Sequence, residues 1–300
     1  MNGTSATAPS AHALHTSRRQ NWRRAFYRFR QSHLSVVGLV IVLLLALSAI
    51  GGTWIVPFPQ QALGAVDTAA RFQPPSLAHL FGTNELGQDM FTLVLSGSRI
   101  SLFAGAAIVL AAATFGTLVG AIAGYFRGWV DEILMRFVDL MLTLPSLILA
   151  LAVAASLGSS LGHTVFAIAL SWWPGFARLV RGEVIAKKEE AFVQAARALG
   201  ATSTRILLRH ILPNVMSPVI VKISLDIGFA ILSVASLGFI GIGVKPPTPE
   251  WGTLLSVARG NMPDYWWTAV FPGLAIFLAV FGFSLLGDGL RDVLDPKARR

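Results

Sequence analysis

The sequence contains no cysteine and few charged residues. The absence of cysteine excludes disulfide bonds and thiolate metal sites. Charged residues make up only 13% of the chain, whereas soluble domains carry about 25%. Hydrophobic residues make up 54%. This balance indicates an integral membrane protein.

The sequence also lacks the motifs of two kinds of enzyme. A phosphate-binding loop needs Gly-Lys followed by Ser or Thr, because backbone amides and the lysine cradle the phosphates. No lysine follows a glycine; the lysines are Lys187, Lys188, Lys222, Lys245 and Lys297. There is no His-Glu-x-x-His zinc pattern. We therefore expect no cofactor and no metal site, and we expect any ATP-driven work to require partner subunits.

The sequence contains five long stretches without a charged residue. They cover residues 34–56, 101–126, 140–177, 227–244 and 265–287. The first is 23 residues long, enough to cross a hydrocarbon core of about 30 Å. The third is long enough for two helices, separated by the turn-like segment 156–162. The pattern predicts an all-α protein with six transmembrane helices.

Basic residues orient these helices. The segment before the first span holds no acidic residue and six arginines, namely Arg18, Arg19, Arg23, Arg24, Arg28 and Arg30. Such a segment is typical of the cytoplasmic side. Six crossings return the C-terminus to that side, where Arg291 and Lys297 are again basic. Topology then accounts for the net charge of +9, and we expect no nucleic-acid partner.

A polar segment between two spans contains a short amphipathic helix. Its apolar stripe has helical spacing and consists of Phe192, Ala195, Ala196 and Leu199. The two alanines would let another surface approach closely, and Gly200 suits a left-handed helix cap. Pro213 fits the first turn of the next helix. The segment predicts a docking site for a partner protein; an ordinary connector between spans is the alternative.

This segment resembles the cytoplasmic EAA loop of bacterial ABC-importer permeases. In that loop, E-A-A precedes a glycine, and I-x-L-P follows after nine further residues. The resembling positions are Glu190, Ala191, Gln194, Ala195, Ala196, Gly200, Leu212 and Pro213. Gln194 replaces the usual acid, and His210 stands where isoleucine is expected. The resemblance implies that the short helix docks in a cleft of an ATPase subunit.

Further segments resemble one branch of these permeases, the inner-membrane subunits of dipeptide, oligopeptide and nickel importers. They cover residues 82–89, 124–131, 235–249 and 286–296. The first reads G-T-N-E-L-G-Q-D against the pattern G-T-D-x-L-G-R-D, so Asn84 and Gln88 depart from it. The basic N-terminal segment, one span and a long outside segment resemble the smaller, C-type permease subunit.

The resemblance implies a type I ABC importer permease fold in the bacterial inner membrane, with both termini cytoplasmic. The implied parts are a cytoplasmic tail (1–33), a first helix (34–56), an extracytoplasmic loop (57–98), a five-helix core (99–288) and a C-terminal tail (289–300). The core contains a coupling loop (182–213). Such a subunit works in a lipid bilayer with a second homologous permease, two ABC ATPase subunits and an extracytoplasmic solute-binding protein.

Two pairs of opposite charges have spacings that place them on one helix face: Arg136 with Asp139, and Lys222 with Asp226. Ionisable residues at membrane depth are functional candidates. Asp139, Lys222 and Asp226 are therefore candidates for the pathway or a cytoplasmic gate. The alternative, which we favour because both pairs lie near cytoplasmic ends, is local neutralisation of charge.

Small residues and prolines predict how the helices pack. Gly116, Gly120 and Gly124 recur every four residues, a ridge suited to close helix contact rather than to substrate binding. Pro145 and Pro174 are expected to kink their helices.

The leading hypothesis is the permease subunit of an ATP-driven peptide importer. The same architecture could instead import nickel or another small solute. A self-sufficient secondary transporter is a different class, and it predicts internal repeats with paired ionisable residues at the bilayer midplane. The sequence does not show these features clearly. Co-purification with ATPase subunits would separate the two classes.

Overall fold

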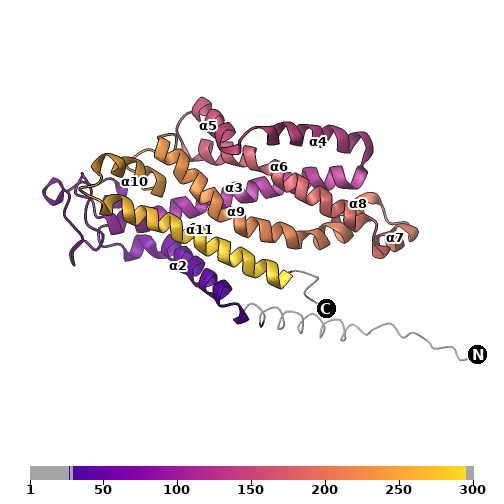
Figure 1. Cartoon of the computed structure of the whole chain (residues 1–300), viewed down its shortest axis with the longest axis horizontal. Helices are drawn as coiled ribbons and strands as arrows, with labels where there is room; N and C mark the ends of the chain where they lie inside the picture. The colour runs from indigo at the N-terminus through magenta and orange to yellow at the C-terminus, as the bar shows by residue number, and fades with distance from the viewer. Residues whose placement is uncertain (1–26, 28–29, 295–300) are drawn as a thin grey trace, which may run out of the picture.

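The computed structural model of the chain describes residues 27 and 30–294, which form a helical bundle (Figure 1). The helices and helical turns, in order, are α2 (His33–Ile55), η1 (Gln61–Leu63), η2 (Thr68–Ala70), α3 (Met90–Phe126), α4 (Gly128–Thr143), α5 (Ser146–Leu157), α6 (Leu161–Lys188), α7 (Ala191–Ala198), α8 (Ser203–Arg205), η3 (Ile206–Ile211), α9 (Leu212–Ile240), α10 (Trp251–Ala258), η4 (Arg259–Asn261) and α11 (Trp267–Leu294). In this part of the chain the expected all-α class is confirmed. Most of the expected cytoplasmic tail, and residues 295–300 of the expected C-terminal tail, lie outside the described residues.

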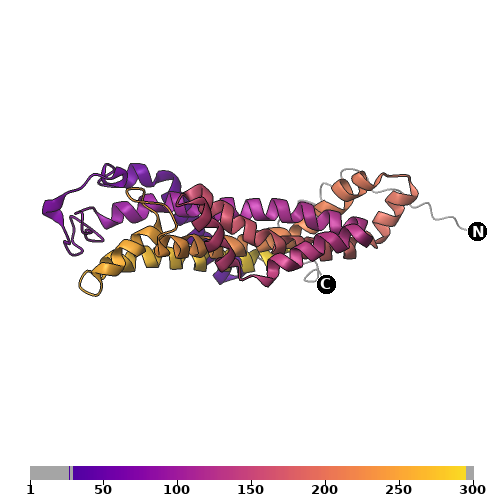
Figure 2. The same cartoon turned by 90° about the horizontal axis from the view of Figure 1, so that it is seen from above.

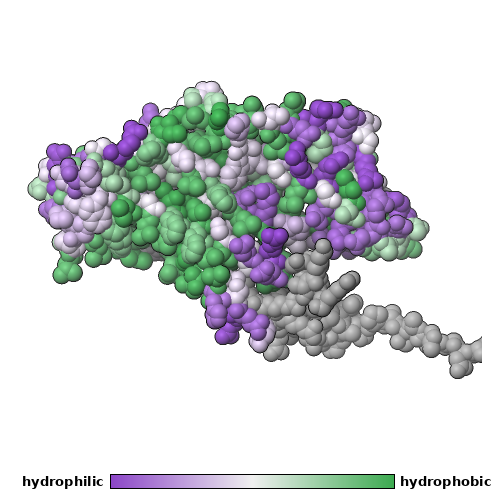
Figure 3. Space-filling view, viewed as in Figure 1, coloured by the Kyte–Doolittle hydropathy of each residue, from purple (hydrophilic) through white to green (hydrophobic). Residues whose placement is uncertain are grey.

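The bundle is elongated, and α5 with its connections to α4 and α6 lies part-way along it (Figure 1, Figure 2). α10 and the segment between α2 and α3 lie at one end, and α7 lies at the other. The N-terminal end of α2 and the C-terminal end of α11 both point toward the α7 end (Figure 1). Figure 3 shows a broad hydrophobic surface along the middle, between hydrophilic ends. The long axis is therefore the direction that crosses a membrane.

Four helical runs among the described residues are long and apolar enough to cross a membrane: His33–Gly52, Met90–Phe126, Ser203–Ile240 and Trp267–Leu294. A fifth span results if α4 and α5, which meet at 87°, are counted as one broken span. α6 has 28 residues, but polar and charged side chains interrupt its apolar sequence. The expected six spans are reached only if the α4–α5 pair and α6 each cross the membrane.

The bend between α4 and α5 lies at Leu144 and Pro145. Proline disfavours the helical conformation in the residue before it, and Leu144 has an extended ψ of 134°. The expected kink at Pro145 is therefore a complete break, whereas Pro174 lies inside the uninterrupted α6. The predicted separation of two helices in the longest uncharged stretch is confirmed, since α5 ends at Leu157 and α6 begins at Leu161.

The contact between α3 and α6 depends on three glycines. A Cβ atom placed at Gly116 would lie 2.6 Å from Phe176 Cβ, and one at Gly120 would lie 3.0 Å from the Arg181 backbone nitrogen. A Cβ atom at Gly124 would lie 2.8 Å from the Arg181 backbone oxygen. These distances leave no room for a side chain, so the predicted close helix contact is confirmed.

Gly120→Val should destabilise the bundle, because the added side chain must push the α6 backbone away from α3. Overpacking of this kind costs about 1–3 kcal/mol. Gly182→Ala is the matched control on α6, since a Cβ atom there meets no atom within 4 Å. Thermal unfolding of the purified protein in detergent measures both variants. An unchanged unfolding temperature for Gly120→Val would contradict the close contact.

The segment between α2 and α3, expected as a long outside loop, forms a compact polar network. Asp89 is only 1% exposed, caps α3 by accepting from the Thr92 N–H at 2.7 Å, and lies 3.0 Å from His79 Nδ1. The indole N–H of Trp267 donates to the Thr83 carbonyl at 3.0 Å, which joins the network to α11. This end of the bundle is thus a folded element rather than a plain connection.

The two residues that depart from the family pattern in this segment, Asn84 and Gln88, are hydrogen-bonded to each other. The amide of Asn84 donates to Gln88 Oε1 at 3.0 Å, and Gln88 Nε2 donates to the Ala65 carbonyl at 3.0 Å. Both side chains are buried. The pattern has Asp and Arg at these positions, so a neutral amide pair replaces a pair of opposite charges.

Asn84→Asp alone should lower stability, because it buries a carboxylate whose partner is neutral. Leaving a buried polar group without its partner costs about 1–3 kcal/mol. Adding Gln88→Arg should recover most of that loss by supplying the opposite charge. A double-mutant cycle on thermal unfolding tests the pairing; additive losses would show that the two side chains do not act together.

Candidate functional site

α7 forms a short projecting helix at one end of the bundle (Figure 1). Glu190 precedes it with extended backbone (φ −72°, ψ 148°), which separates α7 from α6. Gly200 follows it with φ +79°. The N–H groups of Gly200 and Ala201 donate to the carbonyls of Arg197 (3.0 Å) and Ala196 (3.1 Å), the pattern of a glycine-terminated helix. The predicted helix ending at Gly200 is confirmed.

The apolar stripe predicted on α7 is divided between two faces. Ala196 packs against the bundle together with Val193, which is fully buried. Phe192 and Leu199 point outward, with 37% and 89% of their surface exposed, and Ala195 is also exposed. The prediction that Ala196 shares one face with the other three residues was wrong. Ala196 lies one turn from the buried Val193 and packs on the same inward side of α7. The remaining three residues form an outward apolar face at i, i+3 and i+7.

After the non-helical residues 199–202, the chain returns to the bundle as one helical run. α8, the π-helical turn η3 and α9 form one helical run from Ser203 to Ile240. Pro213 sits in the first turn of α9 as predicted. The π-helical turn before it accommodates a residue that cannot donate an N–H. Leu212 is half-buried and packs against the core, whereas Pro213 is exposed.

Polar contacts at the start of α7 are local. Lys187 Nζ lies 2.6 Å from Glu190 Oε1. Gln194 is exposed, and its amide donates to the Glu189 carbonyl at 3.2 Å. The family pattern has an acid at this position. The neutral amide of Gln194 instead donates a hydrogen bond to a carbonyl at the end of α6. Ala191 is exposed as the first residue of the helix.

A groove of about 750 Å³ lies beside the base of the α7 segment, between α6, α9 and α11. Its lining includes Lys187, Pro213, Lys222, Asp226 and Arg291. The predicted pairing of Lys222 with Asp226 is confirmed at 2.9 Å. Lys222 Nζ also lies 4.9 Å from the centre of the Phe176 ring. The groove therefore brings this ion pair and both ends of the α7 region, at Lys187 and Pro213, to one cavity.

Asp139 lies elsewhere and has a different partner from the one expected. It pairs with Arg178 of α6 at 2.6 Å, while Arg136 lies 3.8 Å from Glu132. The predicted Arg136–Asp139 pair was wrong, because α6 presents an arginine to Asp139 across the helix interface. Spacing within one helix could not reveal that partner.

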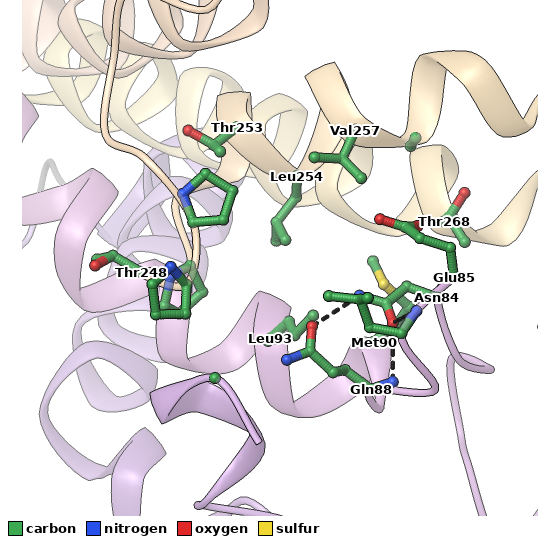
Figure 4. A pocket seen from close by; sticks show the side chains of 16 residues that line it. Asn84, Glu85, Gln88, Met90, Leu93, Thr248, Thr253, Leu254, Val257 and Thr268 are labelled. Atoms are coloured by element: carbon green, nitrogen blue, oxygen red, sulfur yellow. Dashed lines mark hydrogen bonds between the residues drawn. The ribbon is translucent and has the colours of Figure 1, made fainter. Parts of the chain in front are cut away.

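A second cavity, of about 280 Å³, lies at the opposite end of the molecule (Figure 4). It lies between residues 246–249, α10 and the network around Asn84 and Gln88, with apolar walls from Leu93, Leu254 and Val257. Across residues 30–294, no group of three or more His, Asp or Glu side chains is arranged to hold a metal ion.

Comparisons with known proteins agree along nearly the whole chain. Residues 116–300 match the family described as binding-protein-dependent transport system inner membrane component. Residues 20–75 match the N-terminal TM domain of oligopeptide transport permease C. The glutathione transport system permease protein GsiD of Escherichia coli O157:H7 is 45% identical over 281 residues, which are 94% of this chain and 92% of that protein. The dipeptide transport system permease protein DppC of Alkalihalophilus pseudofirmus is 44% identical over 278 residues, 93% of this chain and 90% of that protein.

Proposed function

Because this chain belongs to the family of binding-protein-dependent transport system inner membrane components, we propose that it forms half of the translocation pathway of an ATP-driven importer of di- or oligopeptides. The observation that carries the proposal is α7, a short helix with an exposed apolar face at one end of an apolar bundle. The chain has no phosphate-binding loop of its own. Its contribution is therefore a membrane pathway and a docking surface, without catalysis.

The proposed topology has six crossings: α2, α3, the broken pair α4–α5, α6, the run α8–α9, and α11. Both termini and the coupling loop 182–213 lie in the cytoplasm, and the segment 57–98 lies outside. The shared direction of the α2 start, the α11 end and α7 supports this topology, as do the basic residues of the N-terminal segment. The first helix stands beside a core of five helices, residues 99–288.

The proposed partners are a second homologous permease, two ATPase subunits and an extracytoplasmic solute-binding protein. The outward face of α7, formed by Phe192, Ala195 and Leu199, docks in an ATPase cleft. ATP binding changes the relative stability of an inward-facing and an outward-facing conformation, which requires a rigid connection between the two proteins. Lys222 and Asp226 line the groove near α7 and are the candidates for a cytoplasmic gate in this scheme. Asp139 pairs instead with Arg178 between α4 and α6.

A peptide cargo is supported by the relatives, which are named as glutathione and dipeptide permeases. Nickel or another small solute remains the alternative within this architecture, and a self-sufficient secondary transporter is the alternative outside it. Uptake of a labelled dipeptide, a labelled pentapeptide, glutathione and nickel should be compared in cells lacking this chain and in complemented cells. Loss of peptide uptake, restored by complementation and dependent on ATP, is expected. Loss of nickel uptake alone would overturn the peptide assignment.

Gly200→Val should abolish uptake while the protein stays in the membrane. Gly200 has φ +79°, and a Cβ atom there meets no atom within 4 Å. A β-branched residue is therefore strained by its backbone conformation rather than by crowding, and the end of α7 must change direction.

Gly200→Asn is the matched control for this variant, because asparagine tolerates the left-handed region. It should retain most of the uptake. Immunoblots of membranes report the amount of each variant, and uptake is expressed per amount of protein. Normal transport by Gly200→Val would contradict the docking role of α7.

A further inference from the structure

The turn between α3 and α4 lies against the residues that precede α7. Arg127 has φ +55°, so the chain reverses sharply at this point. Lys188 Nζ donates to the Tyr125 carbonyl at 2.5 Å and lies 5.1 Å from the centre of the Tyr125 ring. Arg127 Nη1 lies 3.8 Å from Glu189 Oε1. Both contacts involve residues directly before the cap of α7.

Beyond this turn, ion pairs hold α4 along α6. Arg181 donates through Nε and Nη2 to the two carboxylate oxygens of Asp131, at 2.5 and 2.7 Å. A two-point bond of this kind fixes orientation as well as distance. Arg178 and Asp139 form a second crossing pair at 2.6 Å. Among the residues of α4, only Val138 is buried, and Met135 and Met141 pack against the core with it. The ion pairs add directional contacts to this small apolar contact between α4 and the bundle.

The two ion pairs differ in how strongly they can hold α4 against α6. The side chains of Arg181 and Asp131 are 35% and 15% exposed, whereas those of Arg178 and Asp139 are more than half exposed. Solvent-exposed pairs contribute little, because water and salt screen them. The Asp131–Arg181 pair is shielded and bidentate, and it joins two helices. It is therefore the strongest candidate for a mechanical link.

We propose that Asp131 and Arg181, with the Lys188–Tyr125 contact, make α4 move with α7 as one body. This inference rests on the proposed function, since it concerns how a displacement of α7 by an ATPase reaches the membrane. α4 leads directly into the 87° bend at residues 144–145. A movement of α7 thus reaches the broken span through the α4–α6 ion pair, and Asp131 and Arg181 are positioning residues.

The test uses the whole importer in liposomes, with its partner permease, ATPases and solute-binding protein. Asp131→Asn should lower peptide uptake about tenfold, within the roughly 5- to 150-fold range of allosteric coupling, while ATP hydrolysis stays within about twofold. The exchanged pair, Asp131→Arg with Arg181→Asp, should restore part of the uptake. Glu132→Gln is the matched control, because its pair with Arg136 lies within α4 and both side chains are 74% exposed. It should transport normally.

Normal uptake by Asp131→Asn would overturn the inference, and so would equal loss of uptake and hydrolysis. If Asp131→Asn does not assemble, Arg181→Lys takes its place. This variant keeps the charge but loses the two-point bond, and it should still lower uptake more than hydrolysis. Failure of the unmodified importer to move any peptide would instead overturn the proposed function.

A second measurement does not depend on the cargo. The chain has no native cysteine. In the double variant Arg136→Cys with Arg197→Cys, spin labels therefore attach to this chain only at those two positions, one on α4 and one on α7. The distance between α4 and α7 should be single and narrow in the purified importer, with and without ATP. Asp131→Asn should broaden the distribution of distances between the two labels. A distance that changes on ATP binding in the parent protein would overturn the inference.

Discussion

The backbone contact between α3 and α6 is the constraint on which the other helix positions depend. In a membrane the lipid chains are as apolar as the side chains, so helices associate through close packing rather than through the hydrophobic effect. Gly116, Gly120 and Gly124 allow that packing, since even a methyl group at any of them would collide with α6. α6 leads toward α7, and α3 begins at the Asp89 network, so this one interface connects the two ends of the molecule.

The two ends use polar residues in opposite ways. At the α10 end, Asp89 and Glu250 are both 1% exposed and accept hydrogen bonds from backbone N–H groups at helix starts. Buried carboxylates satisfied in this way hold a fixed geometry. At the α7 end, Lys187, Glu189 and Glu190 are partly exposed and form ion pairs with neighbouring residues. Polar groups are thus shielded from solvent at one end and open to it at the other.

Local patterns in the sequence predicted the local features well. The glycine ridge, the end of α7 at Gly200 and the Lys222–Asp226 pair each depend on residues a few positions apart, so helical spacing was sufficient. Contacts between helices could not be found in this way. The partner of Asp139 is Arg178, far along the chain, and the role of Val193 depends on where α7 meets the bundle. The docking role of α7 comes from resemblance and stays a prediction.

The length of α3 has a consequence for what surrounds one end of this protein. It has 37 residues and, at about 1.5 Å per residue, extends about 55 Å, whereas the hydrocarbon core is about 30 Å thick. Nearly half of the helix must stand in headgroups and water. Because Arg99 precedes the uncharged stretch 101–126, the capped start of α3 and the Asp89 network are the part that lies outside the core. The cavity of Figure 4 lies beside that start, so headgroups or water, rather than lipid chains, surround it.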